Sequence, residues 1–173
     1  MGKLVGQLLD LARTENVTPQ MERIDFSRLV AGETLPFESV AFEKELALNT
    51  AITSGIAVEG NGAQLKQLTS ILLDNAIRHS KPAGEVRLTL TGDHGIAELS
   101  VINTGDEIPT EHRDKIFERF YRVDKGRSRK AGGTGLGLSI VKHAVIFHGG
   151  NITAVNRQEG GLEFQFSLAR RSK

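Results

Sequence analysis

Hydrophobic and polar positions follow two different periods along this chain, and the two periods predict a mixture of helices and strands. Apolar residues spaced three to four positions apart indicate helices with one buried face, whereas alternation and short apolar runs bounded by turn residues indicate strands. Helices are predicted over 3–15, from a cap at Asp25 or Ser27 to about 45, and over 62–79, 109–117 and 139–147. Strands are predicted over 21–26, 46–52, 85–91, 96–103, 151–156 and 162–168.

The ends of these elements carry local signals. Asn61 is a typical N-cap residue in front of the 62–79 helix, and Gly149 with Gly150 ends the helix that precedes them. Pro36 is expected to kink or interrupt its helix. Turns at 92–95 and 158–161 make hairpins of the strands on either side. The class is therefore α+β, with two layers and helices on one face of a mixed, mostly antiparallel sheet.

Composition limits the cellular compartment and the binding partners that we expect for this chain. Its 173 residues suit one domain with a core of its own, and the absence of cysteine fits a reducing compartment. A net charge of +1 argues against bulk attraction to nucleic acid. No run of apolar residues is long enough to span a membrane. We expect a cytoplasmic domain that itself contacts neither membrane nor nucleic acid.

The glycine-rich stretch at 132–138, which leads into a helix, is the strongest chemical signal. Glycines let the backbone approach a ligand, and a helix start offers free N–H groups and a positive dipole end to an anion such as phosphate. A P-loop is excluded because Leu138 takes the position of its lysine. A dinucleotide-binding turn is excluded because 124–131 is polar and cannot be a buried strand. A flexible surface loop remains the alternative for this stretch alone.

A second signal lies on the helix at 62–79. Asn75 borders its apolar stripe, where its carboxamide needs a partner. That partner is either the backbone, as for an ordinary helix asparagine, or Mg²⁺, which accepts such oxygen ligands alongside waters and phosphates. Arg78 and His79 follow on the same side within reach of a triphosphate.

Two further signals follow along the chain. Asn103 ends a strand before a glycine turn at Gly105, so it either reads an adenine edge or belongs to a plain strand-to-helix turn. The segment 116–122 then joins an apolar start to a basic run that continues past Lys125. Such a run either closes over phosphates or is simply a solvated charged segment.

Taken in their order along the chain, the four signals resemble the N, G1, F and G2 boxes of bacterial sensor histidine kinases. The match is nearly residue for residue over 72–80, 116–122 and 133–138, and the resemblance covers about 20–170. It implies the Bergerat (GHKL) fold, the α/β sandwich shared with gyrase, Hsp90 and MutL-type ATPases. It also implies that 1–18 is the end of a dimerisation and phosphoacceptor helix with its linker, and that 19–173 is the catalytic ATP-binding domain.

The resemblance assigns roles to individual residues. Asn75 would bind Mg²⁺ and act in catalysis together with Arg122, and 122–134 would form a lid over ATP. Asn103 departs from the family because an adenine-reading aspartate is usual there, and Glu107 replaces a glycine. The positions that would contact ATP are Asn75, Arg78, His79, Asn103, Gly105, Ile108, Lys125, Gly133, Thr134, Gly135, Leu136, Gly137 and Leu138.

The same resemblance implies transfer of the γ-phosphoryl group of ATP to a histidine, for relay to a response-regulator aspartate. Ile71 occupies the place of the general-base glutamate of related ATPases, so efficient hydrolysis is not expected. None of the five histidines has the sequence context of the family's acceptor, so we expect no self-labelling. Expected partners are the dimerisation domain of the same kinase, in a homodimer, and a response regulator. A regulatory nucleotide-binding module without activity and a serine kinase of the anti-sigma-factor type are the alternatives.

Overall fold

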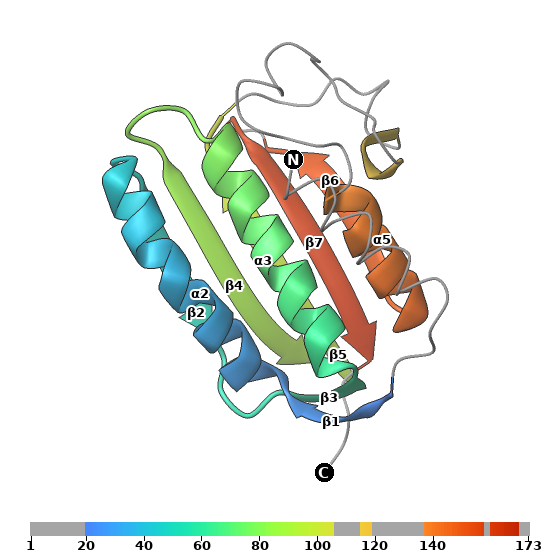
Figure 1. Ribbon diagram of the computed structural model, residues 1–173. Coiled ribbons are helices and arrows are strands. Elements are labelled where there is room, and N and C mark those ends of the chain that lie inside the picture. Colours follow the sequence, from blue (N-terminus) through green and yellow to red (C-terminus); the bar gives the residue numbers. More distant parts are fainter. Residues whose placement is uncertain (1–19, 106–114, 119–136, 158–159, 170–173) are drawn as a thin grey trace.

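The computed structural model describes residues 20–105, 115–118, 137–157 and 160–169, and these ranges form two layers. Three helices cover one face of a five-stranded sheet, while a small two-stranded sheet lies at one end (Figure 1). The helices are α2 (Phe26–Glu43), α3 (Gly62–His79) and α5 (Gly137–Phe147), with a 3-10 turn, η2, at Lys115–Phe117. The strands are β1 (Glu22–Asp25), β2 (Ala47–Ile52), β3 (Ala57–Gly60), β4 (Glu85–Asp93), β5 (Ile96–Asn103), β6 (Asn151–Asn156) and β7 (Leu162–Ala169).

The large sheet has the strand order β2-β4-β5-β7-β6. Only the β2–β4 pair is parallel, and the other three pairs are antiparallel. The predicted mixed sheet with helices on one face is therefore confirmed. Because β5 lies in the middle, its last residue, Asn103, is flanked by Val86 of β4 and Leu162 of β7.

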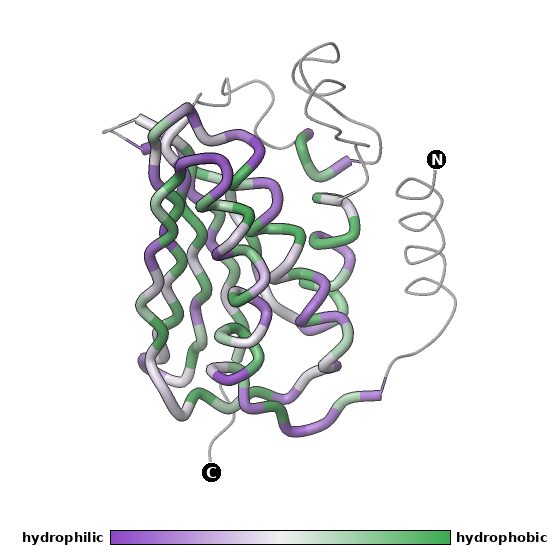
Figure 2. Tube along the Cα trace, turned by 60° about the vertical axis from the view of Figure 1, so that its left-hand side comes forward, coloured by the Kyte–Doolittle hydropathy of each residue, from purple (hydrophilic) through white to green (hydrophobic). Residues whose placement is uncertain are grey.

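The core lies between the helices and the sheet. Along β7 buried and half-buried residues alternate, which places one set of side chains under the helices. Apolar and polar positions alternate visibly along the strands in Figure 2. Phe166 of β7 meets Phe26 of α2 edge to face, with 6.3 Å between ring centroids. Leu72, in the middle of α3, is fully buried, so this helix is fixed firmly above the sheet.

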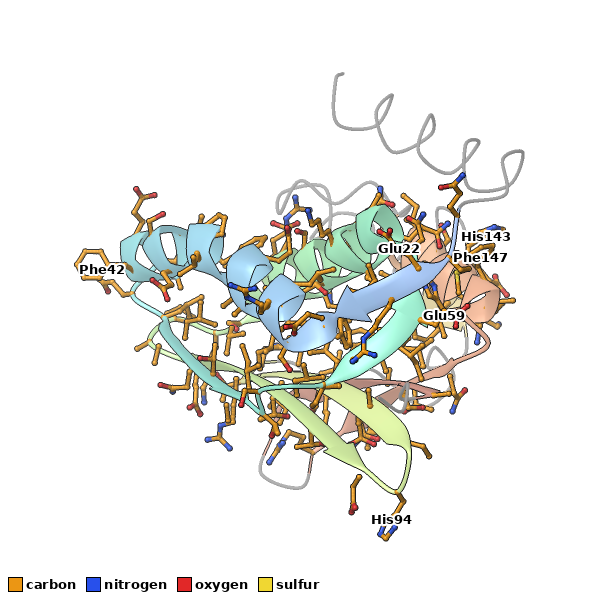
Figure 3. All side chains as sticks on the ribbon, turned by 90° about the horizontal axis from the view of Figure 1, so that it is seen from below. Glu22, Phe42, Glu59, His94, His143 and Phe147 are labelled. Carbon is orange, nitrogen blue, oxygen red and sulfur yellow. The ribbon has the colours of Figure 1, made fainter. Side chains whose placement is uncertain are left out.

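Helix α2 runs through Pro36 without interruption, so the expectation that this proline breaks the helix is wrong. Proline removes the bond to the carbonyl four residues earlier, which is that of Gly32. Both residues are exposed, so water can satisfy that carbonyl. The outer side of α2 also carries Phe42, which is 83% exposed and points away from the body of the molecule at the end of the helix (Figure 3).

Gly32 offers a simple stability test. A Cβ built at this position meets no atom within 4 Å, and the residue lies inside a helix. Gly32→Ala should therefore raise the free energy of unfolding by about 1 kcal/mol, because alanine loses less backbone entropy on forming a helix. Urea denaturation measures the change. An unchanged or lowered midpoint would contradict this account of the position.

Three differences from the sequence prediction concern short elements. Strand β3 was missed because it is only four residues long and pairs with β1 outside the main sheet. The final three residues of the helix predicted over 109–117 form the 3-10 turn η2, and 109–114 lie outside the described residues. Helix α5 begins at Gly137, so the last glycine of the 132–138 stretch is helical. The helix predicted over 3–15 also lies outside the described residues.

Helices α3 and α5 run antiparallel, as two contacts show. Ile71 in the second half of α3 packs against Ile140 near the start of α5. At the other end, the backbone N–H of Asn61 donates to Nε2 of His148 at 3.0 Å. The C-terminal end of α3 and the N-terminal end of α5 therefore lie at the same end of the molecule.

The predicted N-cap at Asn61 is confirmed and is tied to His148. The Asn61 side-chain oxygen accepts from the Gln64 N–H at 2.9 Å, while Nδ1 of His148 lies 2.7 Å from the Ala144 carbonyl. The imidazole thus donates through Nδ1 and accepts through Nε2, which requires the neutral ring. Gln64 stands where a capping box would reach back to the Asn61 N–H. Since His148 accepts that N–H, neither amide atom of Gln64 meets a partner within the described part of the chain.

The buried His148 makes stability depend on pH. Burial lowers its pKa below the usual 6.5, although the Ala144 carbonyl opposes the shift. A histidine with a lowered pKa in the folded state contributes stability above its unfolded pKa and loses it as pH falls. We expect thermal stability to drop as pH decreases below about 6.5, and to drop less in His148→Gln, whose amide oxygen can accept the same bond without titrating. Thermal melts of both proteins between pH 7.5 and 5 measure this, and parallel pH profiles would refute it.

Candidate nucleotide site

The predicted site residues that the structure describes gather at one end of the two-layer fold. This end combines the last turn of α3, the end of β5 and the first turn of α5. Asn75 and Arg78 lie on α3, Asn103 and Gly105 lie at the end of β5, and Gly137 begins α5. Residues separated by more than sixty positions in sequence are thus brought to one place, as the four-motif resemblance implies.

Among the described residues of this end, Asn103 is the most buried polar one, at 2% exposure. Residues 97, 99, 101 and 103 are the buried alternate positions of β5, so Asn103 faces the helical layer. Its Nδ2 donates to the main-chain carbonyl of His79 at 3.4 Å. Its Oδ1 is buried and has no hydrogen-bond partner among the described residues. A buried acceptor without a donor is costly, and the amino group of an adenine would supply that donor.

Gly105 is required by the close approach of two chain segments. A Cβ at this position would run into the His79 carbonyl oxygen, and it would lie 3.1 Å from Nδ2 of Asn103. Gly105 also pairs with Ser80 in an isolated antiparallel bridge. The absence of a side chain therefore lets the end of β5 lie directly against the end of α3. Asn103 and Gly105 are thus brought directly against the last residue of α3.

Thr104, which was not among the residues predicted from the sequence, holds the end of β5 against its neighbours by hydrogen bonds. Its hydroxyl accepts from the Glu85 N–H at 2.8 Å, and its carbonyl accepts from the Lys81 N–H at 2.9 Å. The residue thus joins the start of β4 to the segment after α3. No sequence signal marks it, because threonine is an ordinary strand residue.

The phosphate-contact residue proposed on α3 is engaged elsewhere in this structure. Arg78 pairs with Asp74 one turn earlier, with 3.1 Å between Nη2 and Oδ2. Burial lowers the pKa of Arg78, and burial also raises the pKa of Asp74, although the charges of Lys44 and His79 oppose the second shift. Desolvation therefore works against both charges of the pair. To reach a phosphate, the guanidinium has to exchange a carboxylate for another anion.

Asn75 and Ile71 stand one turn apart on α3, and both are half-buried. Asn75 provides an amide oxygen suited to Mg²⁺. In the described ranges, His, Asp and Glu side chains form no group of three that would hold a metal by themselves. A magnesium ion here would thus depend on Asn75, water and phosphate oxygens, which is how this ion is commonly held. Ile71 packs against Ile140 and supplies no carboxylate.

The motif at 116–122 begins as part of the core. Ile116 is 5% exposed, and Phe117 meets Phe164 edge to face with 6.2 Å between centroids. The Lys142 ammonium of α5 lies 5.6 Å from the centre of the Phe117 ring, within range of a cation–π contact. Ile116 and Phe117 thus attach η2 to α5 and to the sheet. The functional interpretation of the motif rests on Arg122, which lies outside the described residues.

Of the predicted site residues in the glycine-rich stretch, the structure describes only the last two. Gly137 and Leu138 form the first turn of α5, and both are half-buried. The other predicted members of the lid and pocket lie outside the described residues; they are Ile108, Arg122, Lys125, Gly133, Thr134, Gly135 and Leu136.

Comparison with known proteins gives the class to which this fold and site belong. Residues 60–172 match the family of histidine kinase-, DNA gyrase B- and HSP90-like ATPases. The catalytic domain of histidine kinase ThkA superposes with a TM-score of 0.77 at 27% identity, covering 87% of this chain and 96% of that one. Full-length ShkA in complex with AMPPNP superposes with a TM-score of 0.84 at 26% identity, covering 99% of this chain and 36% of that one. The chain belongs to this ATPase family, and the expected GHKL sandwich is confirmed.

Within the family, the relatives in sequence are sensor histidine kinases. SenX3 of Mycolicibacterium smegmatis is 31% identical over 97% of this chain and 44% of its own length. RppB of Synechocystis sp. is 36% identical over 97% of this chain and 38% of its own length. The chain therefore spans about two fifths of the relatives it matches, and it is similar to the ATP-binding catalytic domain of two-component histidine kinases. None of the helices in the described ranges is long and apolar enough to cross a membrane.

Proposed function

We propose that this chain binds ATP with Mg²⁺ and transfers the γ-phosphoryl group to a histidine of a dimerisation domain. The observation that carries the proposal is the buried amide oxygen of Asn103, which has no hydrogen-bond partner in the described part of the chain and lies beneath the end of the helix that bears Asn75. The fold and the relatives support the reaction type. The resulting phosphohistidine would then serve a response regulator.

Each residue of the proposed site has its own role in binding the nucleotide. Asn103 would accept a hydrogen bond from the nucleobase, and Gly105 leaves room for the Asn103 amide beside the His79 carbonyl. Asn75 would hold Mg²⁺, which neutralises charge on the phosphates when bound. Arg78, released from Asp74, would contact a phosphate. Arg122, Lys125 and the glycines of the 132–138 stretch are assigned to the remaining phosphate contacts by resemblance alone.

The absence of a carboxylate at position 71 bears on the fate of the phosphoryl group. Hydrolysis requires a base or a positioning group for water, and Ile71 instead packs against an apolar neighbour. Phosphoryl transfer between bound partners depends chiefly on positioning and charge neutralisation. The site is therefore suited to transfer to a protein acceptor rather than to rapid hydrolysis.

The proposal extends to the organisation of the kinase. Residues 1–18 would be the end of the dimerisation and phosphoacceptor helix with its linker, and 19–173 the catalytic domain. The complete kinase would act as a homodimer, with this domain in the cytoplasm. One solved neighbour is histidine kinase ThkA in complex with response regulator protein TrrA. The kinase superposes with a TM-score of 0.80 at 24% identity, so the likeness shows the fold alone.

Phosphorylation in trans tests the function. The chain is incubated with Mg²⁺, γ-³²P-labelled ATP and the dimerisation domain of the same kinase. Label should appear as acid-labile phosphohistidine on that domain and not on this chain. Label on one of the chain's own histidines would overturn the predicted lack of self-labelling. Binding of ATP without any transfer would instead favour the regulatory nucleotide-binding module.

A further inference from the structure

The carboxamide of Asn103 is asymmetric in its surroundings. Its nitrogen side faces the His79 main-chain carbonyl at 3.4 Å, and its oxygen side is buried without a partner among the described residues. A carboxylate, the usual group at this position in the family, offers only acceptors. An asparagine offers one donor and one acceptor, and which of them faces the ligand depends on how the amide is turned.

The His79 carbonyl decides that orientation. Turning the amide by 180° would place Oδ1 against the carbonyl oxygen of His79, so that two acceptors would face each other. The N–H···O contact of 3.4 Å is long and weak by itself. The alternative orientation, however, exchanges a weak attraction for repulsion between two oxygens in a buried place. The oxygen of Asn103 is therefore held on the side of the amide that faces away from the His79 carbonyl.

The segment that follows the His79 carbonyl is held in place by several hydrogen bonds. Ser80 pairs with Gly105, and the Lys81 N–H donates to the Thr104 carbonyl at 2.9 Å. The Ser80 hydroxyl donates to the carbonyl of Ala76 at 2.8 Å. The missing Cβ of Gly105 allows the His79 carbonyl to come this close. The arrangement consists of backbone and short side chains, so it has little freedom to adapt to a different base.

We propose that the His79 main-chain carbonyl acts as a positioning group that makes this site selective for 6-aminopurines over 6-oxopurines. It does so by presenting only the oxygen of Asn103 to the base. The fixed oxygen accepts from a 6-amino group and opposes a 6-oxo group, whereas a freely turning asparagine would serve both. The inference rests on the proposed nucleotide site and concerns how an uncharged residue keeps the selectivity of a carboxylate.

Equilibrium binding of ATP and ITP tests the proposal. ITP carries an oxygen in place of the 6-amino group and a proton on N1. Titration calorimetry with Mg²⁺ should show ITP binding about tenfold more weakly than ATP or worse, the size expected when a buried acceptor loses its donor. Equal affinities would overturn the proposal while leaving the nucleotide site in place. Failure of both nucleotides to bind would instead refute the proposed function.

Two variants assign the selectivity to Asn103. Asn103→Asp keeps an acceptor in both orientations, so the preference for ATP should persist. Asn103→Leu keeps the approximate shape without donor or acceptor, and the ATP-to-ITP affinity ratio should fall toward one. A ratio unchanged in Asn103→Leu would place the selectivity elsewhere and overturn the proposal. If that variant does not fold, the ratio in the native chain alone still decides the question.

Discussion

Asn75→Ala is expected to reduce phosphoryl transfer to the dimerisation domain by about 100-fold or more. The reason is that Asn75 is the one protein ligand proposed for Mg²⁺ at this end of the fold, and loss of a preorganised group that stabilises charge typically lowers rates by that amount. In the described ranges, no cluster of acidic side chains and histidines could hold the metal ion in its place. Because Asn75 is half-buried on the surface of α3, its truncation should change stability little.

The measurement is the initial rate of phosphohistidine formation at saturating Mg²⁺ and ATP, with stability followed by thermal melts. Asn151→Ala provides a matched control, since Asn151 is an exposed asparagine at the start of β6. The control should transfer at the native rate. A native rate in Asn75→Ala would remove this residue from the mechanism.

Gly105→Ala should damage both the fold and nucleotide binding. Its new methyl group would run into the His79 carbonyl and press on Nδ2 of Asn103. The obstacle is main chain, which cannot move aside as a flexible side chain can. We expect the free energy of unfolding to fall by about 2 kcal/mol, as is typical of overpacking a tight position. ATP affinity should fall by about tenfold or more, because the Asn103 oxygen is displaced.

Denaturant unfolding and calorimetry of the same protein separate these two effects. Gly32→Ala is the control, since it makes the same chemical change where a Cβ meets nothing. If Gly105→Ala bound ATP with native affinity, the close approach of β5 to α3 would have no part in the pocket. Equal stability of the two variants would remove the steric argument.

The sequence predicted the long elements well because their signals are local. The bounds of α3, from its Asn61 cap to His79, follow from a cap and a clear apolar period, and β5 is likewise recovered from 96 to 103. The break expected at Pro36 does not occur, and the Gly32 carbonyl that loses its hydrogen bond lies on the exposed side of the helix, where water can reach it. Strand β3 was not predicted because its pairing with β1 depends on the fold of the chain and not on its own four residues.

For the candidate site too, the sequence predicted some features and missed others. Its side chains on α3 and at the end of β5 could be proposed from the sequence because their types and order form a motif, and the structure places them at one end of the fold. The pairing of Arg78 with Asp74, the orientation of Asn103 and the place of Thr104 were not found. The orientation of Asn103 and the place of Thr104 depend on which atoms meet once the end of α3 lies against the end of β5. The Arg78–Asp74 pair lies within α3 itself, at i, i+4 spacing, and was not considered in the sequence prediction. A main-chain carbonyl such as that of His79 leaves no trace in an amino-acid sequence at all.

The contact between Asn61 and His148 has a further consequence when the length of α3 is considered. This helix has 18 residues, so its two ends are separated by about 27 Å. The pH-sensitive cap lies at one end and the nucleotide pocket at the other. Sites this far apart with no shared partner contribute additively to stability. The two ends can therefore evolve, or be engineered, independently: acid tolerance can change at the cap without any change in base selectivity at the pocket.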